Sequence, residues 1–328
     1  MTLRKLTTTL TLAGLLAGVS LPAFAETLRI GWQQIVEPSR VPQANKTYES
    51  ATGATVEWNL FSGGADVIAA IAAGSIDIGY VGSSPLTAAA SQDLPIETIY
   101  IVGNIAEAEA LAVKGIEKPE DLKGKKIATP FVSTAHYSLL TALEHWGILA
   151  SEVNLLNLRP QEIAAAWERG DIDGAYIWDP VLNQIKTTGG TVLADSSDVA
   201  EWGGPTFDAW IVRKDYAEAH PDIVTAFVKV TGEATDAYLA DPAAWGADSE
   251  QAKKIAGLTG APAADVPTLL KGYVFAGLKD QTSEAFLGAA TAAAIKNTAA
   301  FLQAQGSASA KDDYAGFVNK GFAEAALK

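Results

Sequence analysis

The sequence predicts an α/β protein made of two doubly wound lobes that are joined by a two-strand hinge. A seven-residue pattern, Gly-x-Ile-Asp-x-small-Tyr, occurs at 74–80 and again at 170–176. Each copy follows an Ala-rich run and precedes a turn ending in proline, which predicts a helix closed by glycine, then a short strand and a loop. Open α/β sheets bind ligands at the carboxyl ends of their strands, so two such units predict two facing ligand loops.

The first lobe begins with alternating strand and helix patterns connected by short loops. Strands are expected at 27–31, 55–60, 76–81 and 96–102, and helices at 41–51, after the glycines at 63–64 and after Gly82. This order of elements favours a mostly parallel sheet with helices on both faces.

A second α/β unit follows the polar segment 118–125. Its expected elements are a strand at 126–129, a helix at 136–146, the second copy of the repeat and a strand at 191–193. Short β-branched runs at 110–114 and 209–213 bracket this unit, and we expect the chain to cross between lobes on them. The predicted domains are lobe 1, residues 26–111 and 213–328, and lobe 2, residues 112–212. The largely helical segment from 221 onward is expected to return to lobe 1.

The first 25 residues have the pattern of a secretory signal peptide. Arg4 and Lys5 precede a largely apolar stretch at 10–21, and Ala23-Phe24-Ala25 is an A-x-A cleavage site, so cleavage is expected after Ala25. The apolar stretch is short for the alternative, a retained membrane anchor. The sequence therefore predicts a periplasmic protein.

Composition excludes several classes of function. The formal charge is −14, and it becomes −16 after cleavage because two cations and no acids leave, which argues against nucleic acid or an anionic lipid surface as partner. The chain has no cysteine, hence no thiol nucleophile, no cysteine-based metal site and no cysteine for lipid attachment. No His/Asp/Glu cluster has metal-ligand spacing and no common catalytic motif is present, so neither a metal nor a cofactor is expected.

Two loops carry hydroxyl groups where a strand passes into a helix: Gly82-Ser83-Ser84 and Ser133-Thr134. Hydroxyls and free N–H groups at a helix start form an anion site, although Ser and Thr there often serve only as N-caps. Neither loop contains Arg or Lys, which favours a singly charged anion held by neutral donors. The neighbouring His136 is a further candidate donor, with packing in the first helical turn as its alternative.

A different chemistry is predicted around Asp208, which lies between Phe207 and Trp210 with Trp202 nearby. A carboxylate beside aromatic faces suits an ammonium group. The alternatives are that the tryptophans belong to the core and that Asp179, before Pro180, is a turn residue. Further carboxylates at loop ends are Glu37 and Asp179. An anion site and an acidic aromatic site together suggest a small zwitterion as ligand.

Several longer motifs resemble one family closely. They are Ser62-Gly63-Gly64-Ala65, Gly82-Ser83-Ser84-Pro85-Leu86, Glu109-Ala110-Leu111, His136-Tyr137-Ser138-Leu139-Leu140 and the Trp-rich second repeat. With them the chain resembles the taurine-binding proteins of ATP-driven importers, in the sulfonate/nitrate/taurine group of type II periplasmic binding proteins. The resemblance covers nearly all of the mature chain and is looser in about the last fifty residues.

The resemblance implies a monomeric, non-enzymatic receptor that closes on taurine or a related aminoalkanesulfonate and delivers it to an ABC permease. It implies that the sulfonate meets Ser84, Ser133 and Thr134, with His136 and Gln33 as further donors. The ammonium would meet Asp208, with Glu37 as second candidate and Trp178 or Trp202 as its wall. Asp179 stands where relatives often carry alanine, and it could strengthen amine binding or shift the preference to another aminosulfonate.

Three alternatives remain at this point. The ligand could be an unsubstituted alkanesulfonate or a pyrimidine. The fold could carry an enzyme similar to the pyrimidine-synthesis proteins of this superfamily, which would be expected in the cytoplasm. The protein could also serve a sensory partner.

Overall fold

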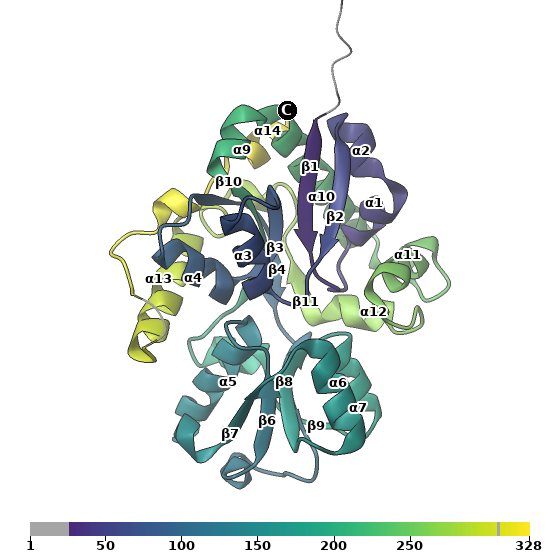
Figure 1. Ribbon diagram of the computed structural model, residues 1–328. Coiled ribbons are helices and arrows are strands. Elements are labelled where there is room, and N and C mark those ends of the chain that lie inside the picture. Colours follow the sequence, from purple (N-terminus) through teal and green to yellow (C-terminus); the bar gives the residue numbers. More distant parts are fainter. Residues whose placement is uncertain (1–25, 307–308) are drawn as a thin grey trace, which may run out of the picture.

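The computed structural model describes residues 26–306 and 309–328. The predicted signal peptide and its cleavage site lie outside these residues. The described chain forms two sheets with helices around each, stacked as two lobes (Figure 1). Within the described ranges, no helix has the length and apolar character that a membrane crossing requires.

The larger lobe, lobe 1, is built on a six-stranded sheet with the order β11-β4-β10-β3-β1-β2. Its strands are β1 (Thr27–Trp32), β2 (Thr55–Leu60), β3 (Ile78–Gly82), β4 (Ile96–Ile105), β10 (Phe207–Arg213) and β11 (Tyr273–Phe275). Strand β1 pairs in parallel with β2 and β3, whereas β10 is antiparallel to both of its neighbours. The predicted strands of this lobe are therefore present.

Lobe 2 holds a five-stranded sheet with the order β7-β6-β8-β5-β9. Its strands are β5 (Glu109–Val113), β6 (Lys126–Thr129), β7 (Asn154–Asn157), β8 (Gly174–Trp178) and β9 (Thr191–Asp195). Both copies of the repeat lead into a fully buried strand next to an antiparallel partner, β3 beside β10 and β8 beside β5. The two lobes thus share a local plan, as the repeat predicted.

Helices cover the faces of both sheets. In lobe 1 they are α1 (Arg40–Asn45), α2 (Thr47–Thr52), α3 (Gly64–Ala72), α4 (Ser83–Ser91), α9 (Lys214–Ala219), α10 (Pro221–Ala240), α11 (Glu250–Thr259), α12 (Val266–Leu269), α13 (Ala289–Ala304) and α14 (Gly321–Ala326). In lobe 2 they are α5 (Thr134–His145), α6 (Pro160–Arg169), α7 (Val181–Thr187) and α8 (Ser196–Glu201). The helix expected at 41–51 is divided in two because Lys46 adopts a left-handed backbone, with φ of 58°.

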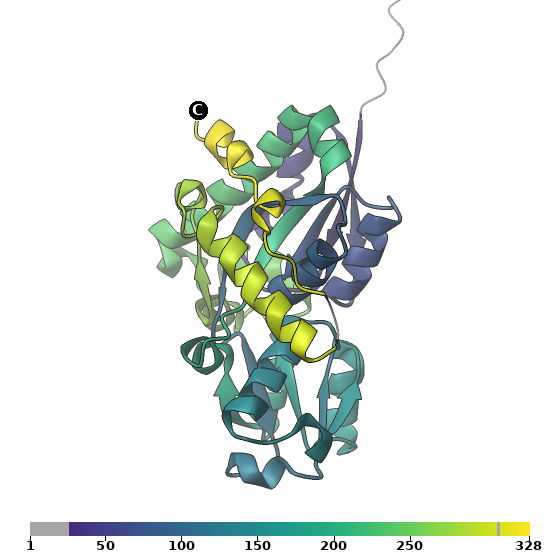
Figure 2. The ribbon, with the colours of Figure 1, turned by 90° about the vertical axis from the view of Figure 1, so that its left-hand side faces the viewer.

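The C-terminal segment packs mainly on lobe 1, and α13 also reaches lobe 2. Figure 2 shows this helix running diagonally from one lobe towards the other. Near its end, the ring of Phe301 packs edge-on against Tyr137 of α5, with ring centroids 4.8 Å apart.

The crossings between the lobes differ from the prediction. Each β-branched run expected to cross belongs to a single sheet: β5 lies in lobe 2 and β10 in lobe 1. The predicted boundaries at 111/112 and 212/213 therefore fall inside strands, and the chain crosses at 106–108 and 202–206 instead. The physical reason is that both runs are mostly apolar and buried, so their backbone groups are paired inside a sheet, whereas the crossings need only short irregular segments.

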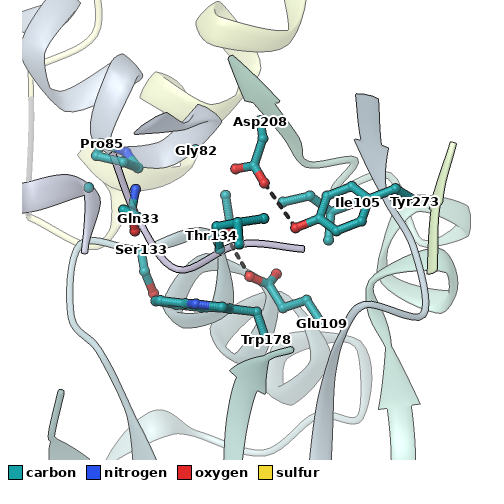
Figure 3. A pocket seen from close by; sticks show the side chains of 12 residues that line it. Gln33, Gly82, Pro85, Ile105, Glu109, Ser133, Thr134, Trp178, Asp208 and Tyr273 are labelled. Atoms are coloured by element: carbon teal, nitrogen blue, oxygen red, sulfur yellow. Dashed lines mark hydrogen bonds between the residues drawn. The ribbon is translucent and has the colours of Figure 1, made fainter. Parts of the chain in front are cut away.

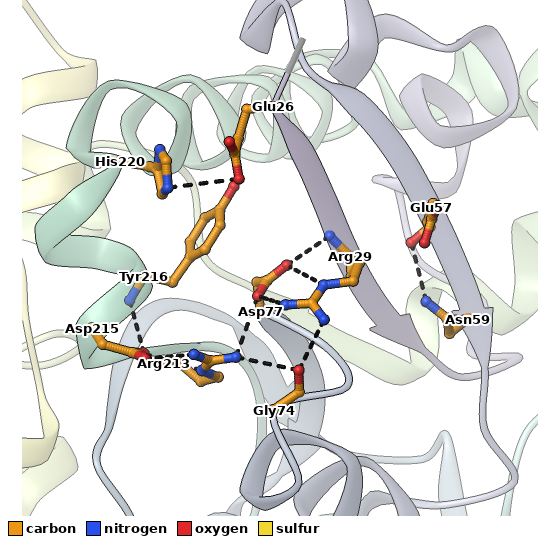
Figure 4. A network of polar contacts seen from close by, with 10 residues as sticks. All are labelled: Glu26, Arg29, Glu57, Asn59, Gly74, Asp77, Arg213, Asp215, Tyr216 and His220. Atoms are coloured by element: carbon orange, nitrogen blue, oxygen red, sulfur yellow. Dashed lines mark hydrogen bonds and ion pairs between the residues drawn. The ribbon is translucent and has the colours of Figure 1, made fainter. Parts of the chain in front are cut away.

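The aspartate of the first repeat is a buried tie within lobe 1. The Asp77 carboxylate accepts hydrogen bonds from the N–H and guanidinium of Arg29, and Arg213 lies 3.5 Å away (Figure 4). Because Asp77 precedes β3, it lies at the end of the sheet away from Gly82, where this strand meets the cavity between the lobes.

Candidate functional site

A cavity lies between the two lobes (Figure 3). Lobe 1 contributes Gln33, Ile35, Gly64, Gly82, Pro85, Ile105, Asp208 and Tyr273 to its lining, and lobe 2 contributes Glu109, Ser133, Thr134 and Trp178. Of the residues predicted from the sequence, this brings together Gln33, Gly82, Ser133, Thr134, Trp178 and Asp208. The lining contains carboxylates, hydroxyls, an amide and aromatic rings but no Arg, Lys or His.

Two helices begin at this cavity, one from each lobe. Gly82 is the N-cap residue of α4 and Ser133 that of α5. The two starts are close, because a methyl group added at Gly82 would lie 2.6 Å from Cγ2 of Thr134. The first N–H groups of a helix lack partners within it and stand at the positive end of its dipole. Both helix starts therefore favour an anion at this end of the cavity.

The hydroxyl groups at these helix starts have different roles. Ser133 Oγ accepts from the N–H of His136 at 3.1 Å and donates to the carbonyl of Pro130, so it is an N-cap. Ser83 Oγ accepts from the N–H of Phe207 at 3.4 Å. Ser84 Oγ is buried and has no hydrogen-bond partner among residues 26–306 and 309–328. Neither Ser83 nor Ser84 is among the residues that line the cavity, although Gly82 and Pro85 on either side of them are. An unpaired buried hydroxyl costs free energy unless a ligand pairs with it, so Ser84 is the free hydroxyl of this group.

Asp208 is held by two tyrosines. The hydroxyl groups of Tyr80 and Tyr273 each donate to Asp208 Oδ2 at 3.0 Å, and Figure 3 shows the Tyr273 bond. Burial raises the pKa of this carboxyl to about 7, against the lowering effect of the two tyrosine bonds. Within the described chain, Oδ1 accepts no hydrogen bond from the protein, so Asp208 offers one oriented oxygen to a ligand.

Glu109 is a second buried carboxylate of the cavity, and we assigned it no role from the sequence. Thr134 Oγ1 donates to its Oε2 at 2.6 Å, and Ser196 donates to its Oε1 at 2.9 Å. Burial raises its pKa to about 7. Because the hydroxyl proton of Thr134 points to Glu109, Thr134 can serve an anion only through its N–H. The available signal was a charged residue at the start of an otherwise apolar run, 109–113.

Glu37 does not line the cavity, contrary to its predicted contact with an ammonium. Its Oε1 lies 2.8 Å from Nη2 of Arg40, and Ser39 donates to it with both N–H and hydroxyl. The Arg40 guanidinium in turn lies over the rings of Trp32, Tyr80 and Trp210. Glu37 is thus neutralised within the core of lobe 1, where a buried charge needs a partner.

His136 and Trp202 also lie outside the cavity lining. The His136 ring stacks on Phe131 with centroids 4.4 Å apart, and burial lowers its pKa to about 4, so it is neutral near pH 7. Its Nδ1 accepts from the N–H of Val132. Trp202 stacks on His145 at 4.1 Å in lobe 2. Both side chains therefore follow the alternative interpretation, in which they pack within the fold, because each ring stacks on a neighbouring aromatic ring.

Asp179, which follows Trp178 in the chain, is buried and is not part of the lining either. It precedes Pro180 through a cis peptide bond, and its Oδ1 accepts from the N–H of Asn183 at 2.9 Å. Burial raises the pKa of this carboxyl to about 7. The turn alternative therefore describes its local role. Across the described ranges, no group of three or more His, Asp or Glu residues has the geometry to hold a metal ion.

Comparison with known proteins places the chain in a family. A model of the substrate-binding domain of ABC-type glycine betaine transport systems matches residues 26–256. The taurine-binding periplasmic protein of Escherichia coli K12 is 46% identical over 96% of this chain and 98% of its own length. The chain belongs to the substrate-binding proteins of ABC importers. The resemblance stated from its motifs is confirmed.

Further members of this family share its sequence and fold. A putative aliphatic sulfonates-binding protein of Bacillus subtilis is 31% identical over 63% of this chain and 64% of its own. The solved alkanesulfonate-binding protein of Xanthomonas axonopodis, bound to MOPS, superposes with a TM-score of 0.73 at 25% identity, covering 87% of this chain and 95% of its own. The predicted two-lobed type II fold is thereby confirmed.

Proposed function

We propose that this protein binds taurine, or a close aminoalkanesulfonate, between its lobes in the periplasm and delivers it to the permease of an ABC importer. One observation carries this proposal: two buried carboxylates, Asp208 and Glu109, share a cavity with two helix starts and no basic side chain. A ligand that satisfies both parts carries a cation and an anion. Taurine, a sulfonate joined to an ammonium by two carbons, has this form, and the identity to the E. coli protein supports it.

The sulfonate is assigned to the starts of α4 and α5. There it meets N–H groups of the first turns, and the buried, unpaired hydroxyl of Ser84, which adjoins the lining residue Pro85 in the chain, is a further candidate donor. A sulfonate carries a single negative charge, so neutral donors and two helix dipoles stabilise it without a guanidinium. Gln33, whose Nε2 already donates to the carbonyl of Tyr80 at 3.0 Å, can position a ligand only through a second bond of its amide.

The ammonium is assigned to Asp208 and Glu109. Both carboxylates are buried and paired only with hydroxyl groups within the described chain, so each gains a full charge partner when an ammonium arrives. The ring of Trp178 lines the same cavity and adds a wall that favours a cation. An alkanesulfonate without an amine would leave both carboxylates uncompensated, which disfavours that alternative.

The proposed action is capture and delivery without chemical change. The match of residues 26–256 to a substrate-binding domain of ABC-type transport, and the identity to the E. coli periplasmic protein, support this action. A ligand drives closure of the two lobes when it makes contacts in the closed state that it lacks in the open state. The contacts of the two helix starts and of Asp208 across the cavity meet this condition.

Calorimetry with taurine, ethanesulfonate and β-alanine tests the proposal. At pH 8, where both carboxylates are charged, we expect taurine to bind at least about 30-fold more tightly than ethanesulfonate, because an unpaired buried charge costs about 2 kcal/mol or more. Asp208→Asn should remove most of this preference. Asp171→Asn is the matched control, since Asp171 is an exposed acid of lobe 2 outside the cavity. Equal affinity of the wild type for taurine and ethanesulfonate would contradict the assigned role of the carboxylates.

A further inference from the structure

Beside the cavity, a side-chain hydrogen bond joins the two lobes. Asn183 Nδ2, on α7 of lobe 2, donates to Asp265 Oδ2 of lobe 1 at 2.9 Å. Both side chains are partly buried. A second contact nearby, from Gln161 Nε2 to Gln34 Oε1 at 3.2 Å, is exposed. None of these four residues lines the ligand cavity. These bonds can form only when the lobes are together.

On the side of lobe 2, the Asn183 bond is connected to the crossing segment 106–108. The N–H of Asp179 donates to the carbonyl of Ala108 at 2.9 Å. The Asp179 carboxylate then accepts from the N–H of Asn183 at 2.9 Å. Asp179 therefore ties the first turn of α7 to the connection between the lobes, and this sets where the Asn183 side chain projects.

On the side of lobe 1, the same bond is connected to the cavity. Asp265 precedes α12, which lies on the side of lobe 1 that borders lobe 2 (Figure 1), and its carbonyl accepts from Thr268 and Leu269. Shortly after α12, the carbonyl of Gly272 accepts from the N–H groups of Ala106 and Ala108 at 3.2 and 3.0 Å.

The next residue, Tyr273, donates to Asp208 in the cavity. A hydrogen-bonded circuit thus runs from the crossing segment through Asp179, Asn183, Asp265 and α12 back to the crossing segment. The segment that carries Asp265, the partner of Asn183, therefore also carries Tyr273, which orients the Asp208 carboxylate in the cavity.

We propose that Asn183 and Asp265 form a latch that favours the closed state, and that Asp179 is the residue that positions it. The inference rests on the proposed function only in that the ligand binds between the lobes. A latch that does not touch the ligand changes the closed population, so it changes the affinity for every ligand of the cavity by one common factor. A ligand-contacting residue changes the preference between ligands instead.

Single substitutions separate these two roles. Asn183→Ala should weaken binding of taurine and of ethanesulfonate by the same factor, about 3- to 10-fold, the value of one hydrogen bond. The dissociation rate should rise by that factor. Gln184→Ala is the matched control, because Gln184 lies on the same helix and bonds Glu168 within lobe 2. It should leave both affinities unchanged.

Exchanging the residues at positions 183 and 265 distinguishes loss of the hydrogen bond from a general effect on folding. Asn183→Asp would place two carboxylates face to face and should weaken binding more than Asn183→Ala does. Combining it with Asp265→Asn restores an amide opposite a carboxylate, and affinity should recover. Asp179→Ala should act like Asn183→Ala, whereas Asp179→Asn, which keeps an acceptor oxygen, should retain binding of both ligands.

Energy transfer between fluorophores gives a direct measure of closure. The chain has no cysteine, so Leu149→Cys in lobe 2 and Leu239→Cys in lobe 1, both exposed, accept labels selectively. At equal ligand concentration below saturation, Asn183→Ala should lower the closed fraction. The latch is overturned if Asn183→Ala affects taurine alone, if it affects neither ligand, or if the exchanged pair fails to recover. Should the wild type prefer ethanesulfonate to taurine, the proposed ligand is wrong, and the ethanesulfonate arm still decides the latch.

Discussion

Asp77 and Asp173 make the same backbone connections in the two lobes. The Asp77 carboxylate accepts from the N–H of Arg29 at 2.9 Å, and its own N–H donates to the Arg29 carbonyl at 2.7 Å. The Asp173 carboxylate accepts from the N–H of Lys126 at 2.8 Å, and its own N–H donates to the Lys126 carbonyl at 2.9 Å. Each aspartate thus bonds the backbone of the parallel strand beside it.

The correspondence extends to the antiparallel neighbour. The carbonyl of Asp77 accepts from the N–H of Arg213 at 3.0 Å, and that of Asp173 accepts from Lys114 at 2.9 Å. In both lobes the repeated aspartate therefore joins three strands at the end of the sheet away from the cavity. The repeat encodes the assembly of a lobe, and the ligand contacts come from the loops at the opposite end.

We expect Asp77→Asn to destabilise the protein more than Asp173→Asn. An asparagine keeps an oxygen for the strand N–H, but at position 77 it loses a buried carboxylate that also bonds two guanidinium nitrogens of Arg29. The expected loss in unfolding free energy is about 1–3 kcal/mol for Asp77→Asn. Asp173 has no such cation partner among the described residues, so less than about 1 kcal/mol is expected. Urea unfolding measures both, and equal losses would contradict this reading.

Local signals in the sequence were sufficient for the lobes and for part of the site. The glycine-closed helices and short strands of the repeat are defined by neighbouring residues, and so are the helix starts at Gly82 and Ser133. Asp208 is predicted from the sequence because the aromatic residues Phe207 and Trp210 lie within two positions of it. These features depend on residues a few positions apart, which a single sequence displays.

Contacts between distant segments were not accessible in the same way. Tyr273 reaches Asp208 from a three-residue strand 65 positions later, and no local pattern marks it. Glu37 was misassigned although its partner Arg40 is three residues away, because the sequence does not show that both side chains are buried. The role of Glu109 depends on Thr134, which another strand and helix bring to it.

Binding of an ammonium ligand should weaken as the pH falls below 7. Burial raises the pKa of both Asp208 and Glu109 to about 7, so acid protonates the groups that face the cation. We expect affinity for taurine to fall by up to tenfold per pH unit for each required carboxylate below pH 7, and to level off above about pH 8. Calorimetry from pH 5.5 to 8.5 measures this.

Two controls accompany the pH series. Ethanesulfonate lacks the ammonium, so its affinity should not fall with acid. Buffers of different ionisation enthalpy should reveal proton release when taurine binds at pH 6.5, because the ammonium lowers the pKa of its carboxylate partners. A taurine affinity that stays constant from pH 5.5 to 8 would refute the assignment of these carboxylates to the ammonium.

Asp208 should also make the ligand-free protein less stable at high pH. Its folded pKa of about 7 lies above its ordinary value of 3.8, so its contribution to stability is complete below about pH 4 and is lost as the pH rises through 7. Asp208→Asn removes this loss, because the amide stays neutral and its oxygen can still accept from the tyrosines. We expect the variant to exceed the wild type in unfolding free energy by roughly 3 kcal/mol at pH 8 and to match it near pH 4. Urea unfolding without ligand checks this, and an unchanged difference between the two pH values would contradict it.

Gly82 should be required for closure because the closed state leaves no room for a side chain at this position. Its backbone conformation does not require glycine. Its φ is −79°, which alanine adopts without strain, but a Cβ there would lie 2.6 Å from Thr134 Cγ2 across the lobe boundary and 3.3 Å from Asp208 Oδ1. Gly82→Ala should therefore leave the stability of the ligand-free protein nearly unchanged and weaken taurine binding about tenfold or more, since the closed state is strained.

Two variants make the Gly82 prediction specific. Gly63→Ala is the matched control, because Gly63 is an extended residue with no atom within 4 Å of an added Cβ, and it should bind taurine like the wild type. Adding Thr134→Ser to Gly82→Ala removes the methyl group in conflict while keeping the hydroxyl that donates to Glu109. Calorimetry should then show a partial recovery of affinity. If the double variant binds no better than Gly82→Ala alone, the contact between the two helix starts does not limit closure, and the alanine must act on the ligand itself.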